Sequence, residues 1–189
     1  VVEVNAGTAV EDFIAIDTET GGVRPGRHAL LSIAAVPSWD RGRGFSVFTE
    51  PFEGSIVEPE AAKKNGYNAS LWTQRGAVPL ELGMLRLTDW LRECFKQKPG
   101  ALMLAHNAGF DRMFLDEASH ITGLQLPIRH AWRCSMDKLG TLMDRGIIPA
   151  GRANLDRLGE LAGLWPVGAR PAVHEAAGDA MACLLGFEW

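Results

Sequence analysis

The sequence predicts an α/β fold in which one mixed, five-stranded sheet is flanked by helices. Three observations indicate this class: three short apolar runs in the first 51 residues, a helical stripe that begins at Leu80, and alternating strand and helix patterns after residue 100. The order βββαβαβααα, without internal repeats, is typical of a mixed sheet covered by helices. A chain of 189 residues suits one domain, which we expect over residues 1–189.

The first three strands are expected at residues 12–17, 28–39 and 44–51, where apolar and β-branched residues dominate. The turn sequence DRGRG separates the second run from the third, so we expect an antiparallel meander. Residues 51–79 contain prolines and glycines throughout. We expect an irregular insertion there, with one short helix around PEAAKK at 59–64 and loop elsewhere.

The remaining elements alternate between helix and strand. From Leu80 to Phe95, apolar residues recur at the i, i+4, i+7 spacing of an amphipathic helix, and a Pro-Gly pair ends the pattern. Two further strands are expected at 101–107 and 128–135. Helices are expected at 109–119, 135–145, 154–163 and 174–186.

Composition limits the function classes. A net charge of −4 argues against a protein that holds nucleic acid by a basic surface alone. No apolar run reaches the roughly 18 residues of a membrane span, and the N-terminal residues lack the pattern of a secretory signal. Three separated cysteines, Cys94, Cys134 and Cys183, form no C-x-x-C pair and favour a reducing compartment. We therefore expect a cytoplasmic protein without membrane contact.

Acidic residues gather where predicted strands and helices end. Asp17 and Glu19 end the first strand, and the alternation of side chains in a strand puts both on one side. Two carboxylates held this close repel each other, so a compensating cation is expected. Asn107 and Asp111 follow the fourth strand. If the first and fourth strands are adjacent and parallel, their carboxyl ends meet at one edge of the sheet.

Three motifs carry a resemblance to a known family. DTET at 17–20, HNAGFD at 106–111 and HEAAGD at 174–179 occur in this order. The chain thereby resembles the DEDD superfamily of 3′–5′ exonucleases, in the subgroup whose third motif carries a histidine. The segment RANLDRLGELAGL also looks like the family's helix before the last motif, so the resemblance covers about residues 12–186. It implies a ribonuclease H-like fold with a three-strand antiparallel meander and two parallel strands.

The resemblance also implies roles for individual residues. The family's metal ligands map onto Asp17, Glu19, Asp111 and Asp179. Its general base maps onto His174, and Glu19 is also expected to accept the terminal 3′-hydroxyl. Oxygen-rich ligands favour two Mg²⁺ ions, for which Mn²⁺ can substitute, over zinc. Such a pair can clamp the attacking and leaving oxygens of a phosphodiester.

Other residues are expected to contact the substrate. The substrate-binding positions are Thr18, Thr20, Gly21 and Asn107. Asn107 is also a natural helix N-cap. Tyr67 and Trp72 could either stack on bases or pack beneath the insertion, and Arg75 could guide the strand's backbone or be ordinary surface charge.

The resemblance implies a metal-dependent 3′–5′ exonuclease that releases nucleoside 5′-monophosphates from single-stranded nucleic acid with a free 3′ end. Similarity to the proofreading-type branch of the family favours DNA as the substrate. An exoribonuclease of the same family is the close alternative, because no residue pattern reads the 2′-hydroxyl. The other alternative is a non-catalytic, metal-stabilised module that binds nucleic acid. An EF-hand site is not expected, since no D-x-[DN]-x-[DN]-G loop occurs. The pattern predicts no particular protein partner.

Overall fold

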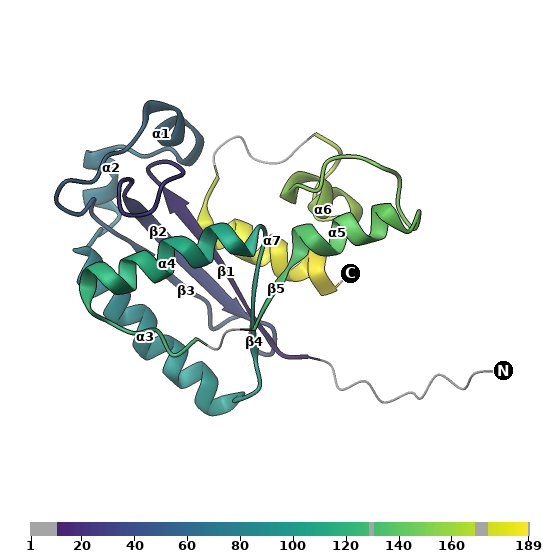
Figure 1. The fold of residues 1–189 in the computed structure, drawn as a ribbon, viewed down its shortest axis with the longest axis horizontal. Helices are drawn as coiled ribbons and strands as arrows, with labels where there is room; N and C mark the ends of the chain where they lie inside the picture. Colours follow the sequence, from purple (N-terminus) through teal and green to yellow (C-terminus); the bar gives the residue numbers. More distant parts are fainter. Residues whose placement is uncertain (1–10, 129–130, 169–173, 189) are drawn as a thin grey trace.

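The computed structural model of the chain describes residues 11–128, 131–168 and 174–188 (Figure 1). Both ends of the expected domain, part of the segment before the third motif, and residues 129–130 of the expected fifth strand lie outside the described residues.

The fold is built on one mixed five-stranded sheet with the order β3-β2-β1-β4-β5. The strands are β1 Phe13–Thr20, β2 Leu30–Pro37, β3 Phe45–Phe48, β4 Leu102–Ala105 and β5 Trp132–Cys134. The β1–β2 and β2–β3 pairs are antiparallel, whereas β4 runs parallel to both β1 and β5. The predicted fold class, a meander followed by two parallel strands, is confirmed.

Helices cover both faces of the sheet (Figure 1). The helices are α1 Pro59–Asn65, α2 Ala69–Gln74, α3 Leu80–Gln97, α4 Ala108–Thr122, α5 Ser135–Asp144, α6 Leu155–Leu161 and α7 Ala176–Glu188. On one face, α3 and α4 pack against the sheet, and on the other face α5, α6 and α7 do so.

The alternation of side chains along β1 produces these two layers. Ile14 and Ile16 are buried in the core beneath α3 and α4, whereas Phe13 and Ala15 are buried in the core beneath α7. Each fully buried aliphatic side chain contributes roughly 1.5–3 kcal/mol through removal of apolar surface from water. The sheet is therefore fixed from both sides, and the residues at its carboxyl edge are held on a rigid support.

The insertion between β3 and α3 is more ordered than its sequence indicates. The expected short helix is α1, but α2 was not predicted. Helix α2 begins at Asn68, whose side chain accepts a hydrogen bond from the Leu71 N–H, and it buries Trp72 against β2. Tertiary packing of one tryptophan therefore stabilises a helix of only six residues, which is too short to form alone.

Within the described part of the chain, we find no helix with the length and apolar character that crossing a bilayer requires.

Candidate active site

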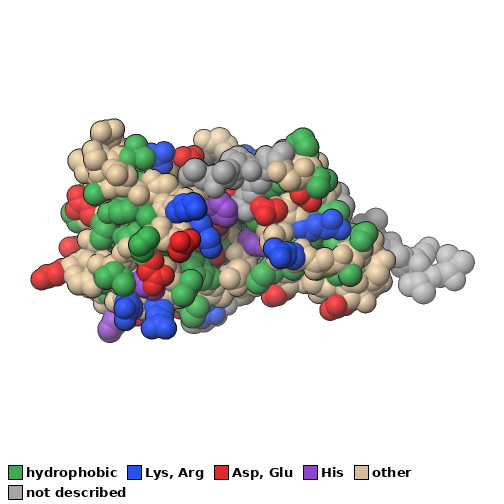
Figure 2. All heavy atoms as spheres, turned by 90° about the horizontal axis from the view of Figure 1, so that it is seen from above, with side chains coloured by type: hydrophobic (Ala, Val, Ile, Leu, Met, Phe, Trp, Pro, Cys, Tyr) green, Lys and Arg blue, Asp and Glu red, His purple; other side chains and the backbone are tan. Residues whose placement is uncertain are grey.

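Three of the predicted site residues meet at the carboxyl edge of the sheet. Glu19, His174 and Asp179 each place a carboxylate oxygen or an imidazole nitrogen within 4.8 Å of the others. The His174 Nδ1 lies 3.7 Å from the Asp179 Oδ2. All three side chains are partly buried. Figure 2 views the molecule from this end and shows histidine side chains beside acidic and basic ones.

The elements that carry these residues explain why they meet. Glu19 lies opposite Ser32 of β2, and the register shifts between Glu19 and Thr20. Irregular pairing of this kind is common beside active sites, where it redirects a side chain. Asp179 lies in the first turn of α7, where the helix dipole favours a negative charge. His174 precedes α7, and its backbone N–H donates to the Lys64 carbonyl of α1 at 3.0 Å.

Asp111 lies on the opposite side of β1, in the first turn of α4. Its side chain is buried, and its Oδ1 accepts hydrogen bonds from the Thr18 N–H at 3.0 Å and the Thr18 hydroxyl at 2.8 Å. Burial raises the pKa of this carboxyl from 3.8 to about 7, although the two bonds from Thr18 oppose the rise. A nearby cation would favour the ionised form, so the site suits a positively charged ligand.

The charges of Asp17 and Asp111 both act on a buried thiol in α7. Burial raises the pKa of Cys183 in α7, and the negative charges of Asp17 and Asp111 raise it further. The Ser135 hydroxyl lies 3.3 Å from the Cys183 sulfur and 2.8 Å from the His106 Nδ1. Of the four predicted carboxylates, Glu19 and Asp179 thus meet beside His174, Asp111 is held by Thr18, and Asp17 lies within β1.

The donor set fits a divalent cation. Carboxylate oxygens dominate it, and a single imidazole nitrogen lies among them. Such sets bind Mg²⁺ or Mn²⁺ readily, and a metal ion would offset the repulsion and desolvation of the carboxylates.

The predicted substrate-binding residues have structural contacts of their own. The buried Thr20 hydroxyl donates to the Gly22 carbonyl at 2.7 Å. A β-carbon on Gly21 would lie 2.5 Å from the Ile56 carbonyl oxygen, so a side chain there would clash with the insertion. Thr18 holds Asp111. Their contact with a substrate stays a prediction.

Asn107 has an unusual backbone. It is exposed and has φ 67°, the one positive φ of a non-glycine residue in the described ranges. Its side chain makes no capping hydrogen bond to α4, so the expected N-cap bond is not formed. Conformations of this kind cluster at functional sites, which agrees with its predicted role without testing it.

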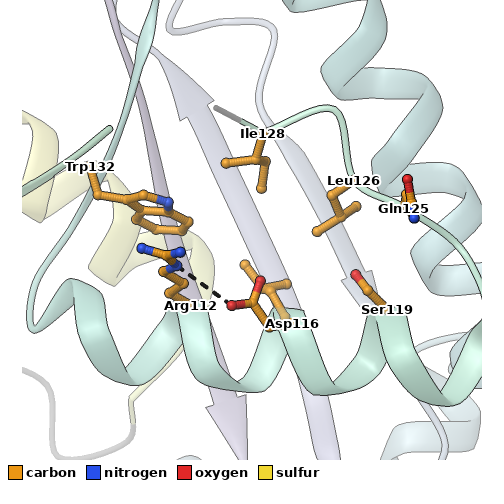
Figure 3. Close-up of a pocket in the computed structure, with 8 residues that line it drawn as sticks. Arg112, Asp116, Ser119, Gln125, Leu126, Ile128 and Trp132 are labelled. Atoms are coloured by element: carbon orange, nitrogen blue, oxygen red, sulfur yellow. Dashed lines mark ion pairs between the residues drawn. The ribbon is translucent and has the colours of Figure 1, made fainter. Parts of the chain in front are cut away.

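A separate cavity lies away from the cluster of Glu19, His174 and Asp179. It has a volume of about 300 Å³ and lies between α4, residues 125–128 and β5. In Figure 3 the Trp132 indole lies beside the Arg112 guanidinium, which pairs with Asp116 at 3.5 Å. None of the predicted site residues lines it, although Arg112 follows Asp111 directly in α4.

Comparison with known proteins supplies the context for this geometry. No family model matches the chain. The chain is 26% identical over 114 residues to the 3′-5′ DNA exonuclease Cap18 of Escherichia coli, a stretch that covers 60% of each protein. It is 37% identical over 123 residues to ribonuclease T of Klebsiella pneumoniae, covering 59% of this chain and 56% of that protein.

A solved structure extends the likeness to nearly the whole fold. E. coli Exonuclease I in complex with a dT13 oligonucleotide superimposes with a TM-score of 0.72 and 14% identity, covering 93% of this chain and 40% of that protein. The predicted resemblance to the DEDD 3′–5′ exonucleases is confirmed. The matches span between two fifths and three fifths of the proteins compared.

The insertion at residues 51–79 makes contacts that involve residues outside the three sequence motifs. Trp72 is buried, and its Nε1 donates to the Leu31 carbonyl at 2.8 Å, so packing accounts for this residue. Arg75 pairs with Glu175, which follows His174, at 3.2 Å. These two residues are 100 positions apart, and no local pattern could have indicated their contact.

Proposed function

We propose that this chain is a metal-dependent 3′–5′ exonuclease that hydrolyses single-stranded nucleic acid, with DNA as the preferred substrate. The observation that carries the proposal is the convergence of Glu19, His174 and Asp179 within 4.8 Å at the end of β1. The similarity to Cap18, named a 3′-5′ DNA exonuclease, supports both the direction and the substrate.

Each predicted residue has a proposed role. The residues that would hold two divalent cations, Mg²⁺ or Mn²⁺, are Asp17, Glu19, Asp111 and Asp179. When bound, such cations stabilise charge on the attacking and leaving oxygens of a phosphodiester. Because the His174 Nδ1 faces Asp179, we assign its Nε2 to accept a proton from the attacking water. Glu19 accepts a hydrogen bond from the terminal 3′-hydroxyl.

The proposal extends to the organisation of the chain. We propose that residues 1–189 form one exonuclease domain, although the proteins it resembles are longer than the matched regions. The described cysteines are free thiols, which is consistent with the cytoplasmic location that we propose.

RNA is the second candidate substrate. The relatives with the higher identity are named ribonuclease T, so an exoribonuclease of the same mechanism has support of its own. The residues near the cluster do not separate the two sugars.

The test compares DNA and RNA strands of one sequence, each labelled at the 5′ end. The wild type should shorten the DNA stepwise from its 3′ end in Mg²⁺ or Mn²⁺, release nucleoside 5′-monophosphates, and stop when a chelator is added. Faster shortening of RNA would favour the second candidate. Binding of both strands without shortening, in any of these metals, would contradict the enzyme proposal and favour a non-catalytic module.

A further inference from the structure

The insertion is fastened to the strands that carry the site. The Asn65 side chain, at the end of α1, is buried, and its Nδ2 donates to the Thr20 carbonyl at 3.0 Å. The buried Trp72 in α2 donates to the Leu31 carbonyl. Buried polar groups with satisfied hydrogen bonds fix relative positions, because breaking them leaves an unpaired group in the interior. Helices α1 and α2 therefore form a platform whose position relative to β1 and β2 is fixed.

The same platform contacts the segment that bears the proposed base. The His174 N–H donates to the Lys64 carbonyl. One residue later, the Glu175 Oε1 lies 3.2 Å from the Arg75 guanidinium. Two consecutive residues of the segment are thus held at two separate points of α1–α2, which restricts both the position and the direction of the segment.

Arg75 is itself held in place. Its guanidinium lies 5.1 Å from the centre of the Phe48 ring and 5.5 Å from that of Trp72. The planar guanidinium is attracted to the faces of aromatic rings, and contact with two rings limits its rotation. Only about a third of the Arg75 side chain is exposed. Unlike most surface ion pairs, this one joins Glu175 to a cation whose position β3 and α2 determine.

Arg75 and the proposed base flank one small cavity. Its volume is about 150 Å³, and Glu19, Arg75, His174 and Glu175 are among the residues that line it. A shift of residues 174–175 across this space would change the distance from His174 to Glu19 and Asp179. In enzyme sites, a displacement of about 1 Å can cost roughly a hundredfold in rate.

We propose that Arg75 is a positioning residue, which acts through its ion pair with Glu175 to place His174 against Glu19 and Asp179. The proposal rests on the proposed function and deepens it, since it gives the insertion a role in the chemical step. Glu175 is the more exposed partner of the pair, and loss of an exposed charge changes stability little. Glu175→Gln should therefore slow turnover while the melting temperature changes little, whereas Arg75→Ala also removes the contacts with Phe48 and Trp72.

The alternative role for Arg75 is direct contact with the substrate backbone. This role predicts the opposite effect of a substitution at Glu175. If Arg75 bound phosphate, Glu175→Gln would release the guanidinium and tighten substrate binding. If Arg75 positions His174, Glu175→Gln should resemble Arg75→Ala and lower the rate at saturating substrate. Glu175→Gln therefore separates the two roles.

The experiment measures single-turnover cleavage of a 5′-labelled DNA strand by Arg75→Ala, Glu175→Gln and the charge-reversed double variant Arg75→Glu/Glu175→Arg. We expect each single variant to cleave roughly tenfold more slowly with unchanged substrate affinity, and the reversed pair to recover part of the loss. Arg92→Ala is the matched control, because it removes an exposed arginine that pairs with Asp89 in α3. In a His174→Ala background, Arg75→Ala should have no further effect.

Two kinetic outcomes would overturn the proposal: a loss confined to substrate affinity, or an equal loss in the His174→Ala background. A readout without substrate separates this proposal from the proposed function. The imidazole NMR signals of His174, assigned by their loss in His174→Ala, should shift in Arg75→Ala and not in Arg92→Ala. If the wild type cleaves no strand but these signals shift, the exonuclease proposal fails while the positioning contact stands. If they do not shift, the positioning proposal is wrong.

Discussion

The two sides of β1 hold their acidic residues in different ways. On the side of α4, Asp111 is buried and accepts two hydrogen bonds from Thr18. On the side of α7, Glu19 and Asp179 are partly buried and lie together with His174. The first side is fixed by donors from Thr18, whereas the second brings two carboxylates and an imidazole close enough to hold a cation.

The difference distinguishes a carboxylate that the protein itself holds in place from a cluster whose proposed role depends on a bound cation. Asp111 has a fixed position in the metal-free protein, at the cost of desolvation. The cluster on the α7 side has less desolvation to overcome, but its carboxylates repel. Removal of a residue from each side should therefore have different consequences for stability and for activity.

The largest effect is expected on the α7 side. Asp179→Asn removes one of two clustered carboxylates while keeping its shape, so turnover in Mg²⁺ should fall at least about a thousandfold and Mn²⁺ affinity should fall with it. The control is Asp144→Asn, an equal change of charge at an exposed residue at the end of α5. Single-turnover cleavage and Mn²⁺ titration of the same proteins test whether turnover depends on metal binding by Asp179. Normal turnover with weakened metal binding would contradict this dependence.

On the α4 side, the buried carboxyl of Asp111 should in addition make the stability of the metal-free protein depend on pH. Burial raises the pKa of the Asp111 carboxyl from 3.8 in the unfolded chain to about 7 in the folded protein. Between these values the folded state holds the extra proton, so the free energy of unfolding of the metal-free protein should fall as pH rises, by at most about 4 kcal/mol. Asp111→Asn keeps the acceptor oxygen for Thr18 and removes the charge. In a chelator at pH 8, the variant should be more stable than the wild type.

Denaturant unfolding between pH 4 and pH 8 provides the measurement. The wild-type curve should slope downward up to about pH 7, and the Asp111→Asn curve should be flatter. Addition of Mg²⁺ or Mn²⁺ at pH 8 should stabilise the wild type more than the variant. Identical pH profiles for the two proteins would show that the buried carboxyl is not the source of the slope.

The smallest effect concerns the hydrogen bond that holds Asp111. Thr18→Val removes the hydroxyl donor and leaves the backbone N–H bond intact. A hydrogen bond to a charged group contributes about 1.5–3 kcal/mol, so turnover should fall roughly tenfold. Thr88→Val is the matched control, since Thr88 is also buried and bonds the Met84 carbonyl in α3. Equal turnover losses in both variants would assign the effect to general destabilisation.

Much of the sheet could be predicted because its signals are local. The alternation in β1 and the turn residues before β3 are visible in the sequence, and the three motifs indicate which residues gather at the carboxyl edge. Helix α2 could not be predicted, because its stability depends on the burial of Trp72 against β2. A short helix that depends on a distant strand leaves no periodic pattern.

The contacts that hold the site residues in place could also not be predicted from the sequence. The backbone N–H and the hydroxyl of Thr18 bind Asp111, which is 93 residues away, while the predicted contact of Thr18 with substrate stays a prediction. The motifs indicated both residues but not their contact, since spacing along the chain does not encode which side chain reaches which. The same holds for Arg75 and Glu175.

The most direct test of the central claim separates the proton acceptor from the metal ligands. The measurement is single-turnover cleavage of a short DNA strand from pH 6 to pH 9, with Mn²⁺ affinity determined on the same proteins. His174→Ala should cleave about 10²–10⁴ times more slowly than the wild type, the usual contribution of a positioned base, and bind Mn²⁺ normally. Asp17→Ala should lose both properties together. Cleavage by His174→Ala at the wild-type rate across this range would contradict the account, and loss of Mn²⁺ binding in that variant would make His174 a ligand instead.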